Sequence, residues 1–140
     1  MKKQLSGDSK DAAKFPASLA GEEYCYLTTT GRVSGNPHEI EIWFGIQDGT
    51  LYMLSGGMDK SDWVRNLLKN PSVTVRIAKH TFTAKARIVS DEREDVTARY
   101  LVAEKYKEWE DGKTLSDWAR TALVVAIDLN YSKIEKNISK

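Results

Sequence analysis

The chain has 140 residues, with 21 lysines and arginines against 20 aspartates and glutamates, which gives a formal net charge of +1. This length is typical of one domain with its own core, and the near-neutral charge disfavours a protein that binds nucleic acid. The single cysteine, Cys25, excludes an internal disulfide and a metal site made of several thiolates. No apolar run approaches the roughly 18 residues of a membrane-spanning helix, so we expect a cytoplasmic protein.

The first 20 residues are polar and rich in small side chains, which predicts a flexible N-terminal arm over 1–20. Residues 21–140 then form a single domain. Residues 23–30 end in three threonines and predict its first strand. Isoleucine or phenylalanine recurs at every second position from 40 to 46, which predicts a second strand over 39–46.

A turn at residues 47–49 leads to a returning strand at 50–55. The stretch that follows predicts a helix, because Ser61 or Asp62 can cap its N-terminus and Pro71 ends it. Two alternating segments, 72–77 and 82–89, predict two further strands.

A second helix is predicted from Ser90 onward, with Val96, Tyr100 and Ala103 on its apolar face. A short helix around residues 114–120 and a buried strand at 121–129 complete the chain. The tally is about six strands joined as hairpins rather than as strand–helix–strand crossovers. This pattern predicts an α+β, mainly β protein whose antiparallel sheet closes toward a small barrel with helices at its edge.

Two glycine-containing loops are candidates for binding an anion. The first, Thr30-Gly31-Arg32-Val33-Ser34-Gly35, combines flexible backbone with hydroxyl donors and a guanidinium. Its spacing alone favours an ordinary hairpin turn over an anion cradle, and no helix pattern follows it as in a dinucleotide or Walker loop.

The second loop, Ser55-Gly56-Gly57-Met58-Asp59-Lys60-Ser61, leaves a strand and opens a helix, whose N-terminus attracts phosphate. The alternative is a capped helix in which Asp62 takes the place of a phosphate. If the strands pair as hairpins, the two loops lie close together and form one clamp for a phosphorylated ligand. Trp43 and Trp63 then offer flat surfaces for a ring system, although packing in the core explains each equally well.

The remaining polar residues do not form a metal or nucleophile motif. His38 and His80 are isolated in the sequence, and no carboxylate spacing accompanies them, so no metal site is predicted. Cys25 lies in a predicted strand and is interpreted as a buried packing residue.

The stretch from Tyr24 to Ile77 resembles the deazaflavin-dependent nitroreductase family. The resemblance is carried by "LTTTGRVSGNP" and "SGGMDKSDWVRNLLKNPSVTVRI", and it resumes at "WARTALVVAID". These proteins are split β-barrels related to the pyridoxamine-phosphate-oxidase-like flavin binders. The resemblance implies a six-stranded antiparallel split β-barrel that binds coenzyme F420. It also implies transfer of a hydride to an electron-poor small molecule such as a quinone, enone or nitro compound.

The resemblance also implies which residues bind the cofactor. They are Thr30, Gly31, Arg32, Ser34, Gly35 and His38, then Trp43 and Phe44, then Ser55, Gly56, Gly57, Lys60 and Ser61, and finally Trp63 and Asn66. Tyr106 is a possible proton donor, with Trp109 and Trp118 near the acceptor.

Two alternatives to a deazaflavin-dependent enzyme stay open. Val33 stands where many members have a lysine, so flavin mononucleotide, which has no acidic tail, is the alternative cofactor. The same barrel could also hold a flavin or another cofactor without turnover. A homodimer is expected, because an open sheet has edges to cover.

Overall fold

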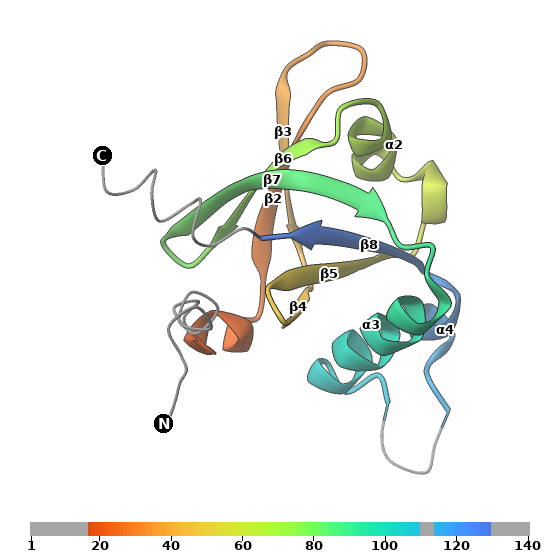
Figure 1. Cartoon of the computed structure of the whole chain (residues 1–140). Coiled ribbons are helices and arrows are strands. Elements are labelled where there is room, and N and C mark those ends of the chain that lie inside the picture. Colours follow the sequence, from red (N-terminus) through yellow and green to blue (C-terminus); the bar gives the residue numbers. More distant parts are fainter. Residues whose placement is uncertain (1–16, 110–113, 130–140) are drawn as a thin grey trace.

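The structure is a computed structural model that describes residues 17–109 and 114–129 (Figure 1). Its strands are β2 (Cys25–Thr30), β3 (Pro37–Ile42), β4 (Gly45–Gln47), β5 (Thr50–Ser55), β6 (Ser72–Ile77), β7 (His80–Ile88) and β8 (Leu123–Asp128). Its helices are α2 (Asp62–Lys69), α3 (Glu92–Lys105) and α4 (Asp117–Thr121), with 3-10 turns η1 (Ala17–Gly21) and η2 (Met58–Lys60).

The seven strands form one antiparallel sheet in the order β3-β2-β6-β7-β8-β5-β4. The sheet curls into a half-barrel, and β3 and β4 lie at its two edges although they follow one another in the chain (Figure 1). The predicted antiparallel, mainly β barrel is thereby confirmed. The expected number of six strands is corrected to seven, because the strand predicted at 39–46 is divided into β3 and β4.

The division falls at Trp43 and Phe44, where side chains of α3 replace a strand as hydrogen-bond partner. The Phe44 N–H donates to Tyr106 Oη at 3.0 Å, and the Phe44 carbonyl accepts from Lys105 Nζ at 2.9 Å. Because both backbone polar groups of Phe44 are paired with these two side chains, the chain can leave the sheet here without an unpaired buried group.

Two clusters of buried side chains lie on opposite faces of the sheet, because Leu51 and Met53 of β5 belong to one cluster and Tyr52 and Leu54 to the other. One lies under α2 and includes Phe44, Leu67 and Cys25, which is 0% exposed as predicted. The other lies between β5, β8 and the helices α3 and α4, and is built largely from alanine and valine. Residues 1–16 of the predicted arm lie outside the described residues, whereas Leu19 of η1 is 3% exposed and packs in the first cluster.

The helices begin close to the predicted positions. Asp91 rather than Ser90 caps α3, because its carboxylate accepts from the Glu94 N–H at 2.9 Å. The last strand begins at Leu123, since α4 extends to Thr121. Among residues 17–109 and 114–129, no helix is long and apolar enough to cross a membrane, and no three metal-ligating side chains gather at one point.

Candidate functional site

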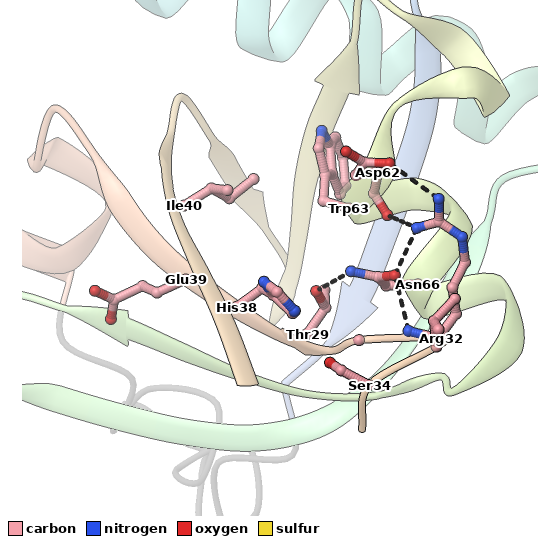
Figure 2. Close-up of a pocket in the computed structure, with 11 residues that line it drawn as sticks. Thr29, Arg32, Ser34, His38, Glu39, Ile40, Asp62, Trp63 and Asn66 are labelled. Carbon is pink, nitrogen blue, oxygen red and sulfur yellow. Dashed lines mark hydrogen bonds and ion pairs between the residues drawn. The ribbon is translucent and has the colours of Figure 1, made fainter. Parts of the chain in front are cut away.

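A cavity of about 510 Å³ lies between the loop after β2, the edge strand β3 and the first turns of α2. It is called the loop–helix cavity below. Loop residues 31–34, strand residues 38–40 and three residues of α2, namely Asp62, Trp63 and Asn66, line it together with Thr29. Figure 2 shows the side chains of His38 and Ile40 directed toward α2 and that of Glu39 directed away, as the alternation of a strand requires.

Arg32 joins the loop to α2. Its Nη1 donates to Asn66 Oδ1 at 2.8 Å and its Nη2 to Asp62 Oδ1 at 3.0 Å, while its backbone N–H donates to the same Asn66 oxygen at 3.1 Å (Figure 2). Asn66 is 5% exposed, and its amide nitrogen donates to Thr29 Oγ1 at 3.2 Å. The first loop therefore lies against the helix that the second loop opens, as the sequence predicted.

The first loop uses most of its own amides internally. The Gly31 N–H donates to the Asn36 carbonyl, the Gly35 N–H to the Gly31 carbonyl, and the Asn36 N–H to Ser34 Oγ. The predicted cradle of converging amides is therefore smaller than expected. Within the described residues, the amides of Val33 and Ser34 make no hydrogen bond and stay available to an anion, with the Ser34 hydroxyl beside them.

Gly31 is packed closely against two side chains of the cavity. A Cβ added there would come within 2.7 Å of both His38 Nε2 and Ser34 Oγ. This crowding brings the only histidine of the cavity and the loop hydroxyl to the same point. Gly35, by contrast, has a φ of +78°, which is the left-handed region that favours glycine.

The first turn of α2 has no side-chain cap. Ser61 occupies the cap position, but its hydroxyl lies 2.8 Å from Ser55 Oγ and does not bond a helix N–H. The prediction that the side chain of Ser61 or Asp62 accepts the free N–H groups of the helix is therefore wrong, although Ser61 is the N-cap residue. Ser55 is 2% exposed and donates to the Met58 carbonyl, so this pair of serines fixes the second loop from inside. The uncapped N–H groups give this end of α2 a partial positive charge.

A second cavity, of about 530 Å³, lies beside Trp43 and Trp118 and is called the aromatic cavity below. The planes of the two indoles are 82° apart with centroids separated by 5.6 Å, so the rings form a corner. Tyr106 stacks on Trp43 at a centroid distance of 4.2 Å and an angle of 6°. Glu41 and Glu108 also line the cavity, and among its described lining residues there is no lysine or arginine.

The two cavities are neighbours along β3. Glu39 and Ile40 line the loop–helix cavity, and Glu41 and Ile42 line the aromatic cavity. Since a strand rises about 3.3 Å per residue, corresponding residues of the two sets lie roughly 7 Å apart. Gly56 gives a second link, because a Cβ added there would lie 3.2 Å from Trp118 Cδ1. The second loop therefore leads from the contact with Trp118 into α2, whose first turns line the loop–helix cavity.

Tyr106 and Lys105, at the end of α3, hold the Trp43–Phe44 segment in place. Tyr106 Oη donates to the Glu23 carbonyl at 2.7 Å and accepts from the Phe44 N–H, and burial raises the pKa of Tyr106 to about 12. Lys105 Nζ lies 3.6 Å from the centre of the Phe44 ring, and burial lowers the pKa of this lysine to about 8. Both groups bond the backbone, which makes them positioning residues for Trp43.

The structure divides the predicted site residues among several places. Gly31, Arg32, Ser34, His38, Trp63 and Asn66 line the loop–helix cavity, and Trp43 lines the aromatic cavity. Gly56, Gly57 and Lys60 lie on the exposed second loop, and Thr30 and Gly35 are the first and last residues of the first loop. Phe44 is 0% exposed and lines neither cavity, because its backbone is turned into the core by α3.

Sequence reasoning missed Thr29 and Glu108 as lining residues. Thr29 was detectable, because the alternation that buries Cys25 and Leu27 also directs Thr29 inward. Glu108 follows α3, and no local pattern connects it with Trp43, more than 60 residues earlier.

Comparison with known proteins identifies the family. A sequence model of the F420H(2)-dependent quinone reductase family matches residues 3–128. No curated protein matches the chain.

Solved structures share the fold. An F420-H2-dependent reductase is 25% identical, with a TM-score of 0.60, and the match covers 75% of this chain and 93% of that one. A domain-swapped dimer is also 25% identical, with a TM-score of 0.59 and coverage of 75% and 79%. A candidate 5-nitroimidazole resistance protein from Bacteroides thetaiotaomicron is 19% identical, with a TM-score of 0.66 and coverage of 81% and 76%.

The loop–helix cavity fits a cofactor with an anionic phosphate. It presents the Arg32 guanidinium, the Ser34 hydroxyl and the uncapped start of α2 from three directions, while Trp63 and Ile40 supply apolar surface for a ring. This agrees with coenzyme F420, and the matching family model is that of an enzyme family. The chain belongs to the F420H(2)-dependent quinone reductase family and is an F420-dependent oxidoreductase.

Proposed function

We propose that this reductase passes a hydride to a flat, electron-poor acceptor, namely a quinone, an enone or a nitro compound. The loop–helix cavity binds the cofactor, and the acceptor occupies the aromatic cavity. When bound, the reduced deazaflavin supplies the hydride. The chain itself orients both molecules and provides no covalent step.

The observation that carries this proposal is the position of two chemically different cavities along one edge strand. The cationic and hydroxyl donors belong to the loop–helix cavity, and the indole corner belongs to the aromatic cavity. Hydride transfer requires donor and acceptor carbons to approach within about 3–3.5 Å. Neighbouring cavities on β3 allow two ring systems to meet at their shared border.

The lining of the aromatic cavity supports this class of acceptor. Indole surfaces pack well against flat rings, and Leu54 adds an aliphatic wall. Glu41 and Glu108 would repel a negative charge on the acceptor, so we expect neutral acceptors to be preferred over acceptors that carry a carboxylate. Glu41 is held by Tyr26, whose hydroxyl donates to Glu41 Oε2 at 2.7 Å.

We also propose that the protein acts as a homodimer. Within the described residues, β3 and β4 each pair on one side only, which leaves two strand edges to be covered. The 25% identical structure described as a domain-swapped dimer supports this assembly. The mass of the purified protein in solution, measured by light scattering, distinguishes a dimer of about twice 15.8 kDa from a monomer.

Parallel titrations test the proposed cofactor and acceptor. Purified protein is titrated with coenzyme F420 and with flavin mononucleotide while the absorbance of each ring is followed. Reduced F420 bound to the protein is then mixed with menadione, a quinone. We expect F420 to bind more tightly than flavin mononucleotide and menadione to oxidise the bound cofactor. Tight binding of flavin mononucleotide without binding of F420 would contradict the proposal.

A further inference from the structure

Asp62 stands at the mouth of the loop–helix cavity with its carboxylate against Arg32. Arg32 Nη2 donates to Asp62 Oδ1 at 3.0 Å, and Nη1 lies 3.5 Å from the carbonyl of the same residue (Figure 2). The Asp62 side chain is 85% exposed, whereas that of Arg32 is 29% exposed. The carboxylate therefore meets the guanidinium from the solvent side, which is the side from which a ligand arrives.

This contact has the chemistry of a bound anion. A carboxylate oxygen on a guanidinium at 3.0 Å is the arrangement that an oxygen of a phosphate or carboxylate ligand would adopt. Asp62 is also the first residue of α2, whose N–H groups lack a side-chain cap. Its negative charge thus faces both positive features of the site, the helix N-terminus and the guanidinium.

Other charges of the cavity do not compensate for Asp62. Among the described lining residues, Arg32 is the only lysine or arginine. Glu39 also lines the cavity, but its side chain is directed away from α2 (Figure 2). Glu39 lies 3.7 Å from Arg76 on the outer face of the sheet, so Arg76 takes up part of its charge. The ion pair with Asp62 consequently decides how much positive charge the cavity offers.

We propose that Asp62 is an internal competitor for anions at Arg32 and so sets the affinity of the site for the phosphate or carboxylate groups of its ligand. This inference rests on the proposed function, since it concerns the cavity assigned to the cofactor. A ligand oxygen must displace the Asp62 carboxylate or bind beside it. When both negative charges, that of Asp62 and that of the ligand, lie within hydrogen-bonding distance of Arg32, their repulsion in water weakens binding of the ligand by about three- to tenfold.

If Asp62 has a positioning role instead, its removal has the opposite effect on ligand affinity. If Asp62 served only to hold Arg32 in a productive position, its loss would loosen the guanidinium and weaken binding. Asn66 keeps Arg32 fixed through two hydrogen bonds in the absence of Asp62, to Nη1 at 2.8 Å and to the backbone N–H at 3.1 Å. We therefore expect Asp62→Asn to leave Arg32 in place.

The test compares Asp62→Asn with Asp59→Asn, which removes the same charge from η2, outside the lining of the cavity. F420 is titrated into each protein by the quenching of its fluorescence, at low salt and at about 0.5 M NaCl. We expect Asp62→Asn to bind F420 about fivefold more tightly than the unmodified protein at low salt. High salt should reduce the difference in F420 affinity between Asp62→Asn and the unmodified protein. The F420 affinity of Asp59→Asn should stay within about twofold of the unmodified protein.

Inorganic phosphate and glutarate serve as separate probes of the anion. The rise in melting temperature that each produces is measured on the same three proteins. A larger rise with phosphate in Asp62→Asn assigns the competition to the phosphate of the cofactor, and a larger rise with glutarate assigns it to the acidic tail. Either outcome supports competition.

Unchanged or weaker F420 binding by Asp62→Asn, while the unmodified protein binds F420, overturns the inference and leaves the proposed function intact. If none of the three proteins binds F420, the proposed function fails as well.

Discussion

The two cavities have nearly the same volume, about 510 and 530 Å³, yet they are built by opposite means. Hydrogen bonds fix the loop–helix cavity, where Arg32 connects to Asp62 and Asn66. Stacked and perpendicular rings fix the aromatic cavity, where Trp43 contacts Tyr106 and Trp118. Size therefore does not assign a ligand to either cavity. Charge and surface chemistry do, and a single strand, β3, supplies a wall to both.

The largest effect is expected for Arg32→Ala, which removes the cation of the loop–helix cavity. Hydrogen bonds to charged groups contribute about 1.5–3 kcal/mol, so F420 should bind about 10- to 100-fold more weakly. The acceptor KM should change little. Fluorescence titration and steady-state kinetics measure the two quantities.

Arg65→Ala is the matched control, because Arg65 lies on the same helix and is exposed outside the cavity. Equal loss of F420 affinity in both variants would show that net charge, and not the Arg32 contact, binds the cofactor.

Trp118→Ala tests the other side of the comparison. It removes one wall of the indole corner, so the acceptor KM should rise about tenfold while F420 affinity stays the same. Because Trp118 also packs against the second core cluster, stability is measured in parallel by thermal unfolding. Trp118→Phe should restore much of the acceptor binding. A loss confined to F420 affinity would reverse the roles of the cavities.

Tyr106→Phe separates positioning from proton donation. The substitution keeps the ring on Trp43 but leaves the Phe44 N–H and the Glu23 carbonyl without their hydroxyl partner. The free energy of unfolding should fall by about 1–3 kcal/mol. The pH profile of kcat should keep its shape, and a lost ionisation in that profile would instead make Tyr106 the proton donor.

Lys105 gives the smallest effect, a pH dependence of stability. Burial lowers its pKa from 10.5 to about 8, so between these values the unfolded chain binds more protons than the folded one. Stability contributed by this group therefore rises with pH from about 8 upward, and the cost of burying the charge is fully present below pH 8.

Unfolding in denaturant at pH 7, 8 and 9 checks this slope. Cys25, whose pKa burial raises from 9.0 to about 12, opposes the slope only from about pH 9 upward. Lys105→Met should lose the rise between pH 8 and 9, whereas Lys107→Met, at an exposed neighbouring position, should keep it. If the free energy of unfolding depends on pH equally in all three proteins, then burial of the charged Lys105 does not destabilise the fold.

Local patterns were sufficient to predict most of the sheet. The hairpin turn at 47–49 placed β5 at its exact residues, and alternation did the same for β6, which has one face in the core. The break between β3 and β4 could not be predicted, since its cause is a pair of hydrogen bonds from α3, about 60 residues away. On α3 itself, Val96 and Tyr100 are exposed, and the buried face is formed by Ala98, Val102 and Ala103. Small side chains let the helix approach the sheet closely, and hydrophobicity alone does not show this preference.

The sequence predicted many residues of the candidate site, but it did not predict that they are separated into two cavities. The sequence placed Arg32 and Asn66 in the same site, which the hydrogen bond between them supports. It also grouped Trp43 with Trp63, but β3 ends just before Trp43 and carries this indole to the other cavity. The end of β3 before Trp43 depends on tertiary contacts, whereas the alternation of apolar residues continues through this position without a break.

Simultaneous binding tests most directly whether the two cavities hold two different molecules. Menadione is titrated by calorimetry into the protein alone and into the protein saturated with oxidised F420. We predict that menadione binds the saturated protein at least as tightly as the free protein, because the bound ring forms part of the acceptor site. Loss of menadione binding on saturation with F420 would show that both ligands compete for one cavity and would contradict the division described above.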